Sequence, residues 1–154
     1  MPKLLWAIFC QQAVVDRFTN HISVINQFDE IHPVRPQAAA AQKPKAQGGA
    51  KPRVAAAFQC ALVSLWEREK PTRSESTEMK VDLLGPKREK LAQFKVILDL
   101  RKHARTRQLT NMPGVPLAGE GTYRFVLRCR DGVKWRHTGV VAFEVKFQEP
   151  PRLH

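Results

Sequence analysis

The sequence predicts an all-β protein, a single-domain antiparallel β-sandwich of seven or eight strands with an immunoglobulin-like or similar topology. Three observations predict this class. Apolar residues alternate with polar ones over several short segments, Gly, Pro, Asn and Asp separate these segments, and no segment has a strong helical pattern. With 154 residues, of which 43% are hydrophobic, the chain suits one domain, 1–154, with a core of its own.

The first predicted element is an N-terminal hairpin. Residues 4–10 form a continuous apolar run, turn residues follow at 16–20, and apolar side chains recur between residues 22 and 28. Lys3 before the apolar run imitates a signal peptide, but the run stops at Gln11 and no small-residue cleavage motif follows. We therefore expect a cytoplasmic protein without a membrane-spanning segment.

The next segment, residues 35–53, differs in composition from the rest of the chain. It is rich in Ala, Gln, Pro and Gly, and it contains five basic residues and no acidic one. Nothing in it is large enough to anchor a core. This composition predicts a flexible Ala/Pro/Lys-rich loop within the domain.

Strand patterns return after this loop. Residues 54–69 predict a strand that is buried on both faces, and residues 79–100 predict a strand, a turn and a second strand. A helix over residues 88–107 is the alternative, since its apolar residues also share a helical face, but we favour the strand. Residues 101–120 predict a second irregular and basic stretch.

The last predicted element is a hairpin over residues 121–147, in which basic and apolar residues alternate. A three-residue loop over residues 130–132 would place Leu127 opposite Trp135 in the core. It would also place Arg128 opposite Lys134 on the solvent face, where like charges repel. Two interpretations stay open: acids on a neighbouring strand compensate this charge, or an anionic partner covers the face.

The net charge of +12 and the pI of about 10.2 favour anionic partners. The candidate residues for such a contact lie on the final hairpin and in the two basic stretches. They are Arg124, Arg128, Lys134 and Arg136; Arg101, Lys102, Arg105 and Arg107; and Lys43, Lys45, Lys51 and Arg53.

Motifs that carry enzyme chemistry are absent from the sequence. It has no phosphate-binding glycine loop, zinc-protease motif or nucleophile elbow, and nothing pairs two carboxylates. The three cysteines include no CxxC pair and fall in phase with apolar neighbours, which predicts small core residues in a reducing cytoplasm. We therefore expect no catalytic residue, no cofactor and no metal site.

These observations predict a non-enzymatic binding module that engages a macromolecule. A protein partner, bound through strand edges and basic loops, is the leading interpretation. The alternative is a nucleic-acid-binding accessory protein that uses the basic loops and the face of the final hairpin. Because aromatic residues are few, such binding would lack sequence preference. An enzyme with a site assembled from loops is the third possibility.

The two ends of the chain, FCQQAVVDRFTNHISVINQFDEI and GTYRFVLRCRDG, are similar to an uncharacterised bacterial family of small all-β domains of unknown function. The resemblance covers the hairpin at each end of the chain. It implies a sandwich fold and transfers no functional residue, cofactor or partner.

Overall fold

The computed structural model describes residues 1–16, 18–34, 54–56, 58–70, 72 and 74–149. The predicted loop 35–53, with its candidate residues Lys43, Lys45, Lys51 and Arg53, lies outside the described residues.

The described residues form strands and no helix, so the all-β prediction is confirmed and the alternative helix over residues 88–107 is wrong. The strands are β1 Lys3–Val15, β2 Ile22–Gln27, β3 Glu30–Ile31, β4 Val54–Ala56, β5 Cys60–Glu67, β6 Ser76–Leu84, β7 Lys90–Asp99, β8 Arg105–Met112, β9 Val115–Leu117, β10 Gly121–Asp131 and β11 Lys134–Val145.

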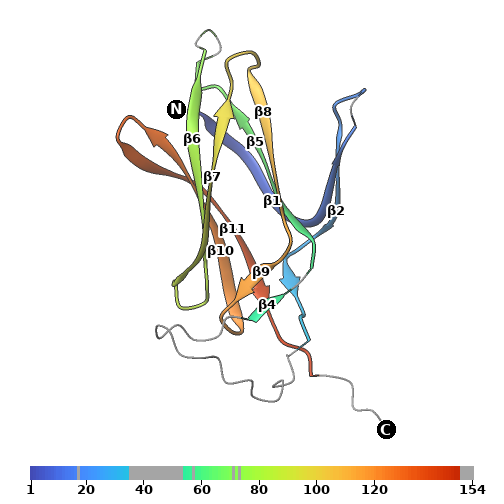
Figure 1. Ribbon diagram of the computed structural model, residues 1–154. Coiled ribbons are helices and arrows are strands. Elements are labelled where there is room, and N and C mark those ends of the chain that lie inside the picture. Colours follow the sequence, from blue (N-terminus) through green and yellow to red (C-terminus); the bar gives the residue numbers. More distant parts are fainter. Residues whose placement is uncertain (17, 35–53, 57, 71, 73, 150–154) are drawn as a thin grey trace.

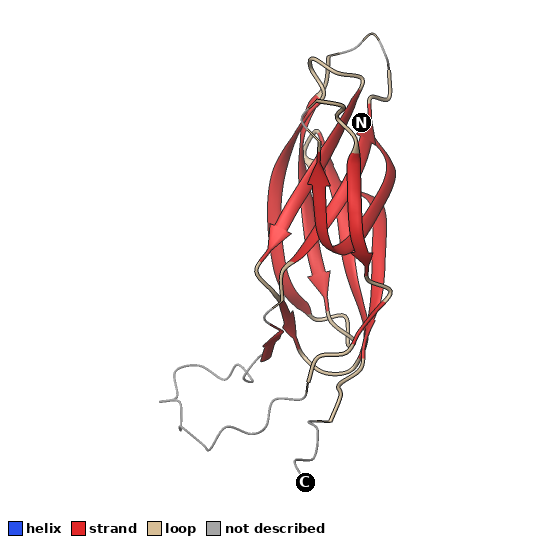
Figure 2. Ribbon diagram, turned by 90° about the vertical axis from the view of Figure 1, so that its right-hand side faces the viewer, coloured by secondary structure: helices blue, strands red, loops and turns tan. Residues whose placement is uncertain are grey.

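The strands form two main sheets. One has the order β2-β1-β5-β8 and the other the order β3-β11-β10-β6-β7, while β4 and β9 make a small third pair. Neighbouring strands are antiparallel except β3 and β11, which are parallel. In the side view, the strands of both main sheets run roughly along one long axis (Figure 2).

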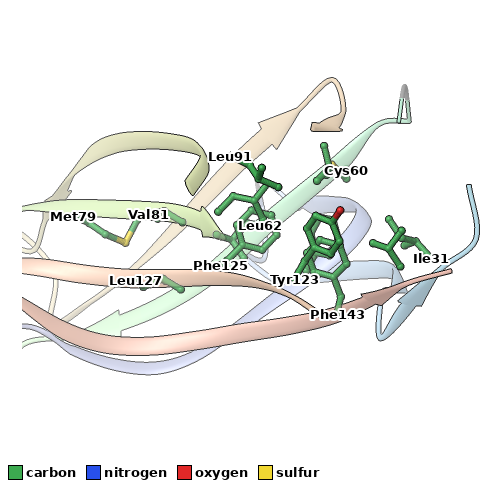
Figure 3. Close-up of a cluster of buried hydrophobic side chains, with 14 of the residues drawn as sticks. Ile31, Cys60, Leu62, Met79, Val81, Leu91, Tyr123, Phe125, Leu127 and Phe143 are labelled. Atoms are coloured by element: carbon green, nitrogen blue, oxygen red, sulfur yellow. The ribbon is translucent and has the colours of Figure 1, made fainter. Parts of the chain in front are cut away.

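The two main sheets pack face to face around one apolar core, because each presents alternate side chains to the other. Phe9 from the four-stranded sheet is 1% exposed. Its ring centroid lies 5.0 Å from that of Phe125 and 4.6 Å from that of Phe143, both in the five-stranded sheet. Figure 3 shows the side chains of both sheets converging on this core. The prediction of a sandwich-like all-β fold is therefore confirmed.

Several predicted elements are found where the sequence placed them. The N-terminal hairpin is β1 and β2, the strand buried on both faces is β5, and the strand-turn-strand segment is β6 and β7. The prediction that residues 101–120 are irregular is wrong, since they contain β8 and β9. The arginines of β8 share its outer face, where water solvates them, so their charge does not prevent a strand.

The predicted count of seven or eight strands is also wrong, because nine strands of the described residues belong to the two main sheets. The two-residue strand β3 is too short to produce an alternating pattern. Strand β8 was not predicted because its segment is rich in basic residues.

The register predicted for the final hairpin is wrong. Asp131 pairs with Lys134, which leaves a two-residue loop with Gly132 in the left-handed conformation (φ 59°). Arg128 lies opposite His137 and not opposite Lys134. A β-bulge, and not a longer loop, brings the apolar residues of β11 onto the core face. The register shifts between Leu127 and Arg128, and Thr138 is the extra residue on β11.

The β1–β2 hairpin builds a second, smaller apolar cluster. The first half of β1 pairs with β5, and the second half pairs with β2. Figure 1 shows β1 bending between these halves, so that β2 leaves the sandwich on the side away from β6 and β7. Ile22 and Val24 pack with buried Cys10 and Val63 on the outer face of the four-stranded sheet.

Tyr123, at the start of β10, fixes the loop that precedes this strand. Its hydroxyl donates to the Gly119 carbonyl at 2.7 Å and accepts from the backbone N–H groups of Ala118 at 2.8 Å and Gly119 at 3.1 Å. The ring is fully buried against Phe143. The core and the loop are therefore joined through one side chain.

We expect Tyr123→Phe to lower the free energy of unfolding by about 0.5–1.5 kcal/mol, because it removes the hydroxyl that bonds to the partly buried backbone of Ala118 and Gly119 without changing the packed ring. Urea denaturation followed by circular dichroism measures this loss. A midpoint equal to that of the wild type would show that water replaces the hydroxyl at no cost.

Candidate anion-binding face

The outer face of the five-stranded sheet carries a row of basic side chains across four strands. Arg128 on β10 lies opposite His137 on β11 and opposite Lys80 on β6, and Lys80 in turn lies opposite Lys95 on β7. Adjacent strands are about 4.8 Å apart, so these four residues form a continuous line perpendicular to the strands. We call this line the basic row.

Trp135 lies on the same face as the basic row. The Nζ atom of Lys80 is 4.5 Å from the centroid of its ring, and that of Lys95 is 5.4 Å away. Both distances are within the range of cation–π attraction. Because these lysines belong to strands that are not neighbours of β11, the indole must extend across the sheet surface.

The position of Trp135 differs from the prediction. The sequence placed it opposite Leu127 in the core, whereas the structure pairs it with Arg130. The bulge at Thr138 explains the difference, because residues on the two sides of it alternate in opposite phase. Phe143 therefore points inward, while Trp135 points outward.

Arg128 is held by an acid of the neighbouring strand. It forms an ion pair with Asp82 on β6, whose side chain is 8% exposed. The second oxygen of Asp82 has no hydrogen-bond partner among the described residues. The interpretation that a neighbouring acid compensates the arginine therefore holds for Arg128, and its guanidinium is fixed in place at the sheet surface.

Glu78 also lies on this face, close to the basic row, and two bases share it. Lys95 lies 3.3 Å from one of its oxygens and Arg130 lies 3.4 Å from the other. Among the described residues, Lys80 and Arg124 have no acidic partner within ion-pair distance. Asp99 and Glu144 lie farther away on the same outer face. Near the row, Asp82 and Glu78 are outnumbered by basic side chains, so the potential there is positive.

The face is hollowed beside Glu78 and Arg130. A cavity of about 460 Å³ is lined there by Ser76, Thr77, Glu78, Ile97, Arg130 and Gly132. The hollow lies beside the basic row, two residues further along β6 and β7, where Glu78 is paired with Ile97.

The other two candidate residues of the hairpin lie on its opposite face. Lys134 pairs with Asp131 across the two-residue loop, and Arg136 lies opposite Cys129. The Arg136 guanidinium forms an ion pair with Asp131 at 2.6 Å. The structure thus separates Arg124 and Arg128 from Lys134 and Arg136, which the sequence had grouped together.

The candidates of the second basic stretch also lie away from the basic row. Arg105 forms an ion pair with Glu67 at 2.8 Å, and Arg107 donates a hydrogen bond to Asn20 at 3.1 Å. Arg101 forms an ion pair with Asp99 at 2.7 Å, and Lys102 is exposed beside it. Three of these four side chains already have partners within the chain.

Sequence reasoning did not identify Lys80, Lys95 and Trp135 as members of one site. The nearest signal was the alternation of Lys80 and Asp82 between apolar residues of β6. Pairing of β6 with β10 joins residues 40 to 50 positions apart in the sequence, and the alternation within one strand does not indicate which other strand it will pair with.

The cysteines offer no reactive thiolate. Cys10, Cys60 and Cys129 are buried and form no disulfide. Burial raises the pKa of the Cys60 thiol to about 11 and that of Cys129 to about 12. Both groups therefore stay protonated near neutral pH, which agrees with the predicted role of small core residues.

Within the part of the chain that the structure describes, no three His, Cys, Asp or Glu residues come together as metal ligands would. A search of the same residues for a helix long and apolar enough to cross a membrane found none.

Comparison of the chain with models of known protein families, and with curated proteins, gave no match.

The Asp82–Arg128 pair provides a test of this geometry. Asp82→Asn and Arg128→Leu should each lower the free energy of unfolding by about 1–3 kcal/mol, because each leaves a poorly solvated group without its partner. The double variant should lose less than the sum of both. The exposed Arg136–Asp131 pair is the control, and Arg136→Leu should cost less than about 1 kcal/mol. Strict additivity at Asp82 and Arg128 would contradict the pairing.

Asp99 provides a test by pH titration. The Arg101 side chain, then the Arg101 backbone N–H, hold the pKa of the Asp99 carboxyl well below its ordinary value of 3.8. A lowered folded-state pKa means that this pair stabilises the fold above pH 3.8 and loses its effect as the pH falls below that value. Carboxyl NMR titration should show the low pKa, and Arg101→Gln should raise it. An ordinary pKa in the wild type would show that the ion pair does not persist in solution.

Proposed function

We propose that this protein is a non-enzymatic binding module that holds single-stranded nucleic acid on the outer face of its five-stranded sheet. The observation that carries the proposal is the position of Trp135 on the outer sheet face, with the Nζ atoms of Lys80 and Lys95 within cation–π distance of its ring. An aromatic ring flanked by cations can stack on a base while the cations contact phosphates. A solvent-exposed sheet face that has no ligand does not require an aromatic ring beside cations.

The direction of the basic row supports an extended ligand. Its residues lie on adjacent strands about 4.8 Å apart, and a backbone that carries a charge at each unit can follow such a line. Arg128 is fixed by Asp82 and gives the line a rigid centre. Since every base has a flat face and the row contacts charge, the proposed binding has no sequence preference.

A protein partner is the second proposal, and the sequence analysis gave it first. Nucleic acid now ranks first because the sequence analysis had placed Trp135 in the core, where it could not stack on a base. The observation that favours a protein partner is the uncharged edge strand β2, which lies in the other sheet from the basic row. The two proposals therefore concern different surfaces.

We also propose that the connectivity is immunoglobulin-like. In support, β5 pairs with β1 and β8 in one sheet, while β10 pairs with β6 and β11 in the other. This order corresponds to strands A-B-E and C-F-G of immunoglobulin domains. Tyr123 near the start of β10 bonds back to the preceding loop, as the corner tyrosine of strand F does in such domains.

A cytoplasmic location is part of the proposal. Its support is the free state of the three buried cysteines, which suits a reducing compartment.

The experiment compares two variants with equal net charge. Lys80→Gln with Lys95→Gln removes two cations of the proposed site, and Lys102→Gln with Lys134→Gln removes two exposed cations elsewhere. Binding to a fluorescent single-stranded oligonucleotide is measured by anisotropy over a series of salt concentrations. We expect the first variant to bind more weakly and to lower the salt slope by about 0.7 for each phosphate that it no longer neutralises, while the second binds nearly as the wild type does.

Trp135→Ala tests the stacking contact separately. It should weaken binding by about 1–3 kcal/mol without changing the salt slope, because it removes a ring and no charge. Quenching of indole fluorescence by the oligonucleotide gives an independent signal. If both lysine variants bound equally weakly, binding would depend on the net charge of the protein and not on this face. Absence of binding at low salt would refute the proposal.

A further inference from the structure

The edge strand β2 differs from every other edge of the two main sheets. Edge strands expose unpaired backbone groups, and proteins commonly protect them with charged residues or proline. Such charges are present on the other three edges: Lys90, Lys95 and Asp99 on β7, Arg105 and Arg107 on β8, and Glu30 on β3. The sequence of β2, ISVINQ, contains no charged residue and no proline.

The strand that pairs with β2 is equally neutral. From Leu4 to Val15, β1 contains no charged residue. Apolar side chains of this hairpin are also exposed: Val14 by 45%, Ile25 by 43% and Phe18, at the tip, by 100%. Gln12 pairs with Ile25 and Val14 with Ser23, so Val14 and Ile25 share one face. The hairpin is therefore a neutral, partly apolar surface on a strongly basic protein.

We propose that β2 pairs with β2 of a second copy of this chain, antiparallel about a two-fold axis. Charge selects the second copy as the occupant. Two chains with a net charge of +12 repel each other wherever basic surfaces meet, and this hairpin is a surface on which they can approach without that repulsion. A two-fold axis makes the same strand supply donors and acceptors on both sides, which closes the assembly at two copies.

Side-chain placement supports the antiparallel arrangement. The regular part of β2 is Ile22 to Ile25, since Asn26 has a positive φ of 51°. In an antiparallel pair, the start of one strand lies beside the end of the other. Each exposed Phe18 tip would then lie near the end of the partner's β2, and Ile25 of each copy would lie beside the start of the partner's β2. The two four-stranded sheets would become one continuous sheet, and the basic rows would remain open.

The test is the molar mass of the nuclease-treated protein by light scattering over a range of concentrations. We expect the mass to rise from 17.5 kDa toward twice that value. Ile25→Lys introduces a charge at the β2 edge and should restore the monomer. Ile97→Lys is the matched control, because Ile97 is 63% exposed on edge strand β7 and its replacement should leave the dimer intact.

Salt provides a second readout that separates this inference from nucleic-acid binding. Screening weakens repulsion between two basic copies, so added salt should favour the dimer, whereas it weakens binding of a polyanion. Hydrogen exchange of the β2 amides should also slow as concentration rises, which tests the wild type without any substitution. A mass of 17.5 kDa at every concentration and salt level, or dissociation by Ile97→Lys alone, would overturn the proposal. Neither result would bear on oligonucleotide binding.

Discussion

One extra residue on β11 determines which side chains of the final hairpin reach the core. At Thr138 the ladder with β10 shifts by one position, and the Thr138 hydroxyl donates to the Leu127 carbonyl. Val141 and Phe143 beyond the bulge then pack inward, while Trp135 and His137 before it face solvent. Without the shift, one end of β11 would expose its apolar residues or bury its polar ones, because side chains alternate with a period of two. Both the core and the basic row depend on this shift.

The two sheets present outer faces of different character. The five-stranded sheet carries a positive row, fixed at its centre by the Asp82–Arg128 pair, and an indole that lies across it. The four-stranded sheet ends in a neutral hairpin with exposed apolar side chains. The two proposals therefore differ in the salt response that they predict, since screening weakens attraction to a polyanion and also weakens repulsion between like-charged copies. A dimer through β2 would present two basic rows to one ligand, and binding at both would strengthen the whole contact.

Much of the fold follows from local patterns. The alternation in β6 and β7, the turn residues between them and the apolar run of β1 predicted strands that the structure contains. The irregular assignment of residues 101–120 failed because Arg105 and Arg107 face water on an edge strand, where charge and strand formation are compatible. Of the four candidate residues on the final hairpin, Arg124 and Arg128 lie on the face of the basic row, whereas Lys134 and Arg136 lie on the other side of the hairpin.

The sequence by itself determined the all-β class, the buried state of the cysteines and the excess of positive charge, because each depends on residue type and on a period of two along the chain. The tertiary structure decided which charged side chains lie together on one face. Lys80, Lys95 and Trp135 meet because β6, β7, β10 and β11 pair in one register, and the bulge at Thr138 sets the phase of the last strand. Such pairings depend on the burial of whole strands from distant segments, and a local pattern does not record which strand will lie beside which.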